Sequence, residues 1–190
     1  VSLCVLCAFP LNRYWESGYT MARAMIKYYP RLPSGYCALG NEYFDAKMFP
    51  EAKEAFLDCL ERGGTDSGTY YMLGVCSLPE PDEAVQYFRK SIETEPRHAL
   101  SYVGLGRYYL LAGEYKTAIG YLEKSAALTP TYAGYSYLIQ AHLLLGEEAQ
   151  ARQLLHQAVD VIEEEDQRTS LKKLWDFREK KIFPVDVGIG

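Results

Sequence analysis

The sequence predicts an all-α protein built from stacked pairs of antiparallel helices. Three glycines, Gly40, Gly74 and Gly106, recur at intervals of 34 and 32 residues in a similar apolar context. Each is followed at a nearly constant distance by an alanine, and a proline or glycine then ends the segment. The 190-residue chain is 48% hydrophobic and 24% charged, which is ordinary for a globular protein. We therefore expect one helical unit repeated along the chain.

The first helix of each predicted pair contains the recurring glycine. A tyrosine lies four positions before each glycine and a leucine directly before it: Tyr36 and Leu39, Tyr70 and Leu73, Tyr102 and Leu105. Apolar residues spaced three and four apart form one face of an α-helix. Glycine costs about 1 kcal/mol relative to alanine inside a helix. Its recurrence at this position indicates that close packing requires it.

The second helix of each pair is marked by an alanine followed four positions later by a large apolar residue. These pairs are Ala52 and Phe56, Ala84 and Phe88, and Ala118 and Leu122. Pro50 and Pro81 fall near helix starts, where a missing N–H costs nothing. The stops are Gly64, Pro96 and Pro130. We expect each glycine to let its helix approach the small alanine opposite, so that dispersion contacts offset the lost helix propensity.

This pattern resembles the tetratricopeptide repeat (TPR) family, whose unit is a helix–turn–helix of about 34 residues. The resemblance covers roughly residues 33 to 163. The second unit is shortened, and the fourth is degenerate because Ile139 replaces the glycine while Ala151 and Leu155 keep the later pair. The resemblance implies a right-handed TPR-type α-solenoid of antiparallel helix pairs.

The chain divides into four predicted segments. They are an apolar N-terminal segment (1–13), a half-repeat helix (14–32), four TPR-like repeats (33–163), and a capping helix with a tail (164–190). The last helix places apolar side chains on one face, as expected where a solenoid ends. These residues are Leu171, Leu174, Trp175 and Ile182, with Arg178 on the same face.

The N-terminal segment is uncharged but shorter than the ~20 apolar residues of a membrane-spanning helix. It fits either the end of a membrane helix that begins upstream, and hence a membrane tether, or a simple packing helix. Asn12, Arg13 and Trp15 resemble the junction before the repeat array in multi-pass membrane glycosyltransferases. That resemblance implies an alternative function, a soluble accessory domain with catalysis outside this chain. It would place the domain on the periplasmic or extracytoplasmic side of the membrane, whereas the default expectation is cytoplasmic.

The sequence predicts no enzyme, cofactor or metal site. His98, His142 and His156 accompany no nucleophile or acid at a catalytic spacing, and His142 fits a satisfied core histidine. Cys4 and Cys7 form a C-x-x-C pair without the second pair that a zinc site needs. The net charge of -5 argues against nucleic acid as a partner.

The five cysteines, an odd number, do not indicate a disulfide framework. Cys59 and Cys76 occupy positions where small apolar residues are expected. We therefore expect both to be buried thiols.

The TPR resemblance implies a binding groove lined by the first helices. Mapping the groove positions gives Asn41, Phe44, Tyr71, Val75, Val103, Arg107, Leu110, Gln140 and Leu144. Asn41 matches the asparagine with which chaperone-binding members hold a peptide carboxylate. Cys37 replaces the accompanying lysine, and Met72, Leu100 and Gly104 replace the other clamp residues, so the clamp is incomplete.

The predicted function is a non-catalytic scaffold that binds a peptide or partner protein in the concave groove. Apolar anchors and one charge-assisted hydrogen bond from Arg107 would hold the partner. Two points stay open: Arg107 could pair with a nearby acid, and Tyr71 could pack internally. The seventeen tyrosines also make self-association an open alternative.

Overall fold

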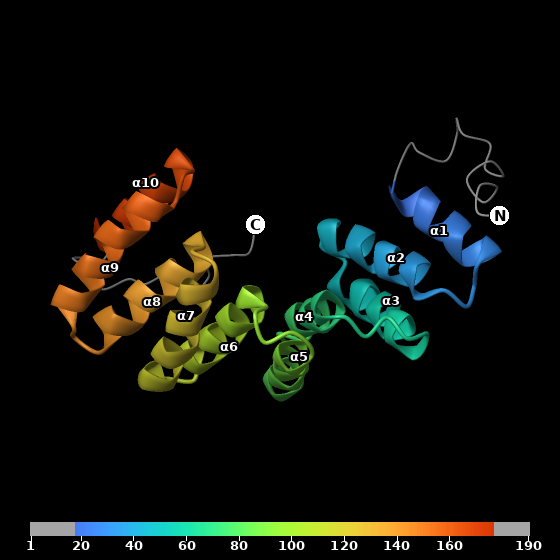
Figure 1. The fold of residues 1–190 in the computed structure, drawn as a ribbon, viewed down its shortest axis with the longest axis horizontal. Helices are drawn as coiled ribbons and strands as arrows, with labels where there is room; N and C mark the ends of the chain where they lie inside the picture. The colour runs from blue at the N-terminus through green and yellow to red at the C-terminus, as the bar shows by residue number, and fades with distance from the viewer. Residues whose placement is uncertain (1–17, 177–190) are drawn as a thin grey trace. The chain divides into compact units, whose positions relative to one another are not determined.

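The computed structural model describes residues 18–176, and all regular structure in this range is α-helical. This confirms the predicted all-α solenoid of helix pairs (Figure 1). The helices are α1 (Gly18–Tyr28), α2 (Pro33–Asp45), α3 (Phe49–Glu61), α4 (Ser67–Cys76), α5 (Pro81–Thr94), α6 (Ala99–Leu111), α7 (Tyr115–Leu128), α8 (Tyr132–Leu144), α9 (Glu148–Val161) and α10 (Glu165–Asp176). None of these described helices has the length and apolar character needed to cross a membrane.

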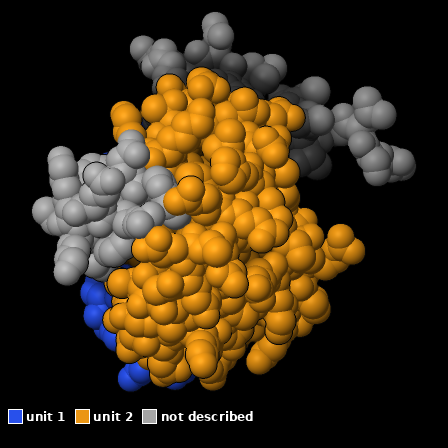
Figure 2. All heavy atoms as spheres, turned by 90° about the vertical axis from the view of Figure 1, so that its left-hand side faces the viewer, with its two compact units in different colours: residues 1–87 blue, residues 88–190 orange. Residues whose placement is uncertain are grey.

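The chain forms two compact units, residues 1–87 and 88–190, with the boundary inside α5 (Figure 2). In the first unit α2 packs against α1 and α3, and α3 packs against α4. In the second unit α7 packs against α6 and α8, and α9 packs against α8 and α10. Within each unit these helices thus bury apolar side chains against their neighbours in sequence, as in a stack of helix pairs.

Local signals explain where several helices begin and end. Pro33 occupies the first turn of α2 and Pro50 the first turn of α3, where proline costs no hydrogen bond. Asp66 caps α4 because its Oδ1 accepts a hydrogen bond from the Thr69 backbone N–H at 2.9 Å. Thr131 caps α8 in the same way through the N–H of Gly134 at 3.1 Å.

Three of the turns between paired helices contain a residue in the left-handed backbone conformation. Gly113 follows α6 and Gly146 follows α8, each with φ of 79°. Lys47 follows α2 at the corresponding point with φ of 61°. A non-glycine residue is strained there because its Cβ crowds the backbone.

Two of the three recurring glycines, Gly40 and Gly106, make room for the large residue of the second helix. A Cβ on Gly40 would lie 2.7 Å from the ring of Phe56, and one on Gly106 would lie 2.5 Å from Leu122. The expected contact opposite Ala52 and Ala118 therefore needs correction, since the nearest atoms belong to Phe56 and Leu122. The alanines are fully buried, and their small size lets the helices pack closely.

Gly104 makes room in a similar way. A Cβ at this position would lie 2.7 Å from the buried ring of Phe88. The sequence alone indicates only that Gly104 stands where a clamp residue is expected. The structure shows that it lets α6 pack against the ring of Phe88.

The prediction of a buried thiol was wrong for Cys59 and confirmed for Cys76. Cys59 forms a disulfide with Cys37 at a Cα–Cα distance of 5.3 Å. The two residues are 22 positions apart, and the antiparallel pairing of α2 and α3 brings them together. Cys76 is free and buried, and burial raises the pKa of its thiol to about 11.

The last described helix packs onto the end of the second unit. Leu171 of α10 is fully buried and belongs to an apolar cluster that includes Ile139, Ala158 and Ile162. Predicted features in residues 1–17, including the apolar segment and Asn12, Arg13 and Trp15, lie outside the described residues, as do Arg178 and Ile182.

Candidate binding surfaces

The first unit contains four of the predicted groove residues. Asn41 of α2 is exposed, and Phe44 is partly buried with its ring edge-on to Phe49 at a centroid distance of 5.5 Å. Tyr71 of α4 is partly buried, whereas Val75 is only 7% exposed. The accessible surface of this set therefore comes from α2 and from Tyr71.

The second unit contains the other five predicted residues, and three of them are buried. Val103 and Leu110 of α6 belong to the apolar cluster that joins α6, α7 and α8. Gln140 of α8 is also buried, and its Nε2 donates to Ser136 Oγ at 3.4 Å. Leu144, at the end of α8, is exposed.

Arg107 lies on α6 and differs from the other predicted residues in its hydrogen bonding. Its Nε is buried and has no hydrogen-bond partner within residues 18–176. No ion pair within this range includes Arg107. The described residues therefore do not contain the acid with which it was expected, as one alternative, to pair. A buried donor without an acceptor costs about 1–3 kcal/mol, which an incoming acceptor would relieve.

Two histidines have partners that account for their positions. His142 is buried, and its Nδ1 lies 2.7 Å from Glu147 Oε2, which confirms the expected satisfied core histidine. His98 Nδ1 lies 2.8 Å from Ser101 Oγ, which donates to Ser91 Oγ at 2.6 Å. Both serines are fully buried, so neither hydroxyl can reach a substrate, and the network instead links α5 to α6.

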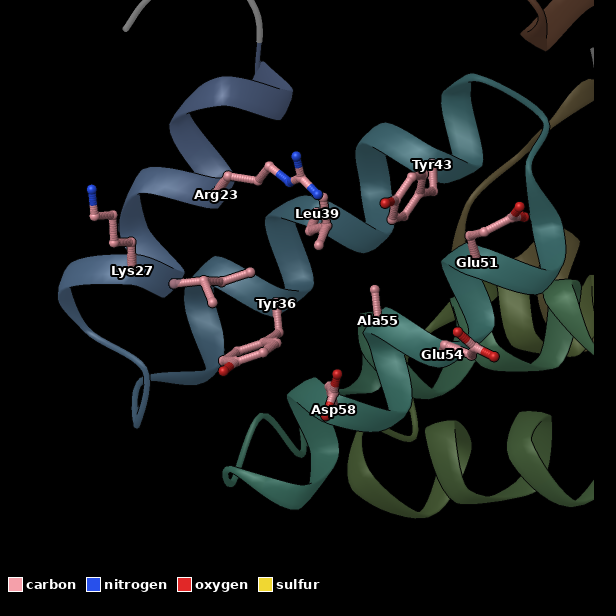
Figure 3. A pocket seen from close by; sticks show the side chains of 10 residues that line it. Arg23, Lys27, Tyr36, Leu39, Tyr43, Glu51, Glu54, Ala55 and Asp58 are labelled. Carbon is pink, nitrogen blue, oxygen red and sulfur yellow. The ribbon is translucent and has the colours of Figure 1, made fainter.

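A pocket that the sequence did not predict lies in the first unit between α1, α2 and α3 (Figure 3). Its volume of about 450 Å³ is within the range of binding pockets. One wall is basic and comes from α1, the opposite wall is acidic and comes from α3, and aromatic and aliphatic side chains of α2 lie between them. The lining residues are Arg23, Ile26, Lys27, Tyr36, Leu39, Tyr43, Glu51, Glu54, Ala55 and Asp58.

Tyr43 is held in place at one end of the pocket. Its hydroxyl lies 3.3 Å from that of Tyr19, and the two rings meet edge-on at 5.6 Å. The hydrogen bond with Tyr19, aided by burial, raises the pKa of Tyr43. The Arg23 guanidinium lies 5.0 Å from the centre of the Tyr19 ring. The raised pKa means that the phenol of Tyr43 stays neutral at physiological pH.

Tyr36 is fixed at the other end. Its hydroxyl donates to the backbone carbonyl of Pro30 at 3.1 Å, and the Arg62 guanidinium lies 3.9 Å from its ring centre. Arg62 Nη1 in turn donates to Asp58 Oδ1 at 2.9 Å. Contacts at both ends thus fix the positions of the two tyrosines.

These features define the class of protein: a helical repeat array with accessible surfaces between and along its helices. Residues 80–133 match the sequence profile of the tetratricopeptide repeat. Residues 80–133 thus carry the sequence pattern of this repeat, and the described helix pairs continue the same type of fold beyond the matched region. Arrays of this kind are protein-interaction scaffolds, and their stacked helices present extended binding surfaces.

At least two of the solved structures with a similar fold are TPR proteins. TTC0263, a thermophilic TPR protein in Thermus thermophilus, aligns over 81% of this chain and 87% of its own with 20% identity and a TM-score of 0.68. YrrB, described as a TPR protein with an unusual peptide-binding site, aligns over 80% of each chain with 20% identity and a TM-score of 0.62. MamA aligns over 80% of this chain and 87% of its own with 22% identity and a TM-score of 0.66.

At these identities the likeness is one of fold. A search of curated proteins by sequence gave no significant match.

Proposed function

We propose that the chain is a non-catalytic scaffold that binds a peptide segment of a partner protein along its first helices. The site in the second unit is centred on Arg107, with Leu144 as an apolar anchor and with Val103, Leu110 and Gln140 beneath it. In the first unit Asn41, Phe44, Tyr71 and Val75 form a further contact surface. YrrB, which has a similar fold, is described as having a peptide-binding site, and this agrees with the proposal.

The buried, unpartnered Nε of Arg107 is the observation that carries this proposal. A peptide carboxylate would supply the missing acceptor and form a charge-assisted hydrogen bond, which is stronger than a neutral one. The buried floor of Val103 and Leu110 keeps α6 rigid against α7 and α8. Because α6 is already packed in this way, binding would cost little further ordering of its backbone.

Selection of short random peptides on the intact chain tests the proposal. We expect the enriched peptides to contain a carboxylate and to lose about tenfold or more in affinity on Arg107→Met, which corresponds to about 1.4 kcal/mol. Arg97→Met is the matched control, because Arg97 is exposed in the connection between α5 and α6 of the same unit. It should leave the affinity unchanged.

Thermal unfolding of both variants separates binding from folding. Arg107→Met removes an unsatisfied buried donor, so its unfolding midpoint should equal or exceed that of the wild type. Peptides that bind Arg107→Met as well as they bind the wild type would contradict the proposal. A parallel loss of stability and affinity would also contradict it, because Arg107 would then be a structural residue.

A further inference from the structure

The pocket between α1, α2 and α3 has a counterpart in the second unit. Positions separated by the interval from Gly40 to Gly106 correspond, so Arg23 corresponds to Arg89 and Tyr43 to Tyr109. Tyr36 and Tyr102 likewise correspond, and each donates to a proline carbonyl six residues earlier at 3.1 Å. The surroundings of the two sites are therefore built on the same plan.

The counterpart site is filled by a side chain of α7. The ring of Tyr121 stacks on that of Tyr109, with centroids 5.4 Å apart and planes 3° from parallel. Arg89 Nη2 donates to the Tyr109 hydroxyl at 3.1 Å, and Lys124 Nζ lies 6.0 Å from the centre of the Tyr121 ring. An aromatic ring with basic neighbours thus completes this site.

The first unit lacks this ring. Ala55 occupies the position that corresponds to Tyr121, and Figure 3 shows it pointing from α3 into the space below α2. The pocket therefore lies where the second unit places an aromatic side chain. Tyr43 lines it, as Tyr109 lines the counterpart. Offset stacking of aromatic rings is favourable beyond the area that it buries.

The charges on the pocket walls would set the orientation of a bound segment. Arg23 and Lys27 lie on α1, whereas Glu51 and Glu54 lie on α3. None of these four side chains forms an ion pair with another described residue. A bound segment with an acid toward α1 and a base toward α3 would match both walls.

We propose that this pocket binds an aromatic side chain of a partner polypeptide, stacked on Tyr43, with an acidic neighbour facing Arg23 and Lys27 and a basic neighbour facing Glu51 and Glu54. The site is separate from the Arg107 surface. A peptide that binds here should therefore bind Arg107→Met as well as it binds the wild type.

Filling the pocket with a tyrosine side chain, as in the counterpart site, tests the proposal. Ala55→Tyr places on α3 the ring that Tyr121 supplies on α7. Ala127→Tyr is the matched control, because Ala127 is exposed on α7 in the other unit. Short random peptides are selected on the wild-type chain and then depleted on Ala55→Tyr. We expect the remaining peptides to contain tyrosine, phenylalanine or tryptophan between an acid and a base, and to lose about tenfold or more in affinity on Ala55→Tyr alone.

A charge exchange tests the predicted direction. Arg23→Glu should weaken binding of the selected peptides. Replacing the acidic residue of the peptide with lysine should restore binding to that variant only. If Ala55→Tyr does not fold, Ala55→Leu fills the same space with a smaller side chain and serves in its place. Circular dichroism and thermal unfolding verify that the variant is folded.

Three results would overturn the proposal. The first is that no selected peptide distinguishes the wild type from the filled variant, and the second is that the discriminating peptides lack an aromatic residue. The third is a concentration-dependent dimer of the wild type that Ala55→Tyr abolishes, because the occupant would then be a second copy of this chain.

Discussion

Gly40→Ala should destabilise the first unit, although alanine is the better helix former. Alanine at this position gains about 1 kcal/mol of helix propensity. The new Cβ would lie 2.7 Å from two carbons of the Phe56 ring and 2.9 Å from a third. Phe56 is only 1% exposed, so the rigid ring cannot move aside without displacing its neighbours. Overpacking of this kind costs about 1–3 kcal/mol. The overpacking cost minus the propensity gain leaves a net loss of up to about 2 kcal/mol.

Gly120→Ala is the matched comparison at an exposed position of a helix. A Cβ at Gly120 in α7 would meet nothing within 4 Å, so the propensity gain of about 1 kcal/mol should appear in full. Equilibrium unfolding in urea, followed by circular dichroism, gives both changes in free energy. The double variant Gly40→Ala with Phe56→Leu should recover part of the loss caused by overpacking. If Gly40→Ala stabilises the chain as Gly120→Ala does, the role assigned to the recurring glycines is wrong.

Three further changes test the local structure. Reducing the Cys37–Cys59 disulfide with dithiothreitol should lower the free energy of unfolding by about 3 kcal/mol, because the disulfide closes a 22-residue interval of the chain. Identical urea unfolding curves with and without reductant would exclude this contribution of the disulfide. Lys47→Gly should raise the free energy of unfolding by about 1 kcal/mol because Lys47 has φ of 61°, and a loss of stability would contradict the strain. Asp66→Ala should cost about 1 kcal/mol through loss of the α4 cap, measured in the same urea experiment.

The Asp66 cap also predicts a pH dependence. Burial opposes ionisation of this carboxyl, but hydrogen bonds from the Thr69 hydroxyl and backbone N–H outweigh it and lower its pKa. Its contribution to stability is therefore fully present above the unfolded pKa of about 3.9 and is lost as the pH falls through the lower folded pKa. Urea unfolding between neutral and acidic pH measures this loss, and Asp66→Asn should show less of it. Equal acid sensitivity of both chains would contradict the assignment.

The helix pairs could be predicted from the sequence because close packing restricts residue size at fixed intervals. Gly40 and Phe56 face each other across a pair, and so do Gly106 and Leu122. Only a glycine leaves space for these large side chains, so the pattern is visible without a structure. What the spacing does not reveal is which residue of the second helix the glycine faces, because the alanine and the large residue recur together.

The candidate sites were harder to predict because accessibility depends on the size of the neighbours. Val103 and Leu110 occupy groove positions according to their spacing in the repeat, yet Leu138 and the residues around it bury them. The pocket next to Ala55 arises from a missing ring, which is apparent only when the position is compared with Tyr121. The comparison of corresponding positions in the two units was the available signal in the sequence.

The disulfide left no comparable signal. Cys37 and Cys59 are two of five cysteines, and their separation alone does not show that the two side chains face each other. Their pairing depends on the rotation of α2 about its axis relative to α3. Packing sets that rotation.

The central claim, that Arg107 awaits an acceptor from a peptide, is tested most directly by NMR of the guanidinium Nε–H. A selected carboxylate peptide is titrated into the chain labelled with ¹⁵N-arginine, and Arg107→Met identifies the Arg107 signal by its absence. A hydrogen bond to the peptide should shift this signal downfield in proportion to occupancy, while the signal of Arg97 stays in place. An Arg107 signal that does not move when the peptide is fully bound would contradict the account.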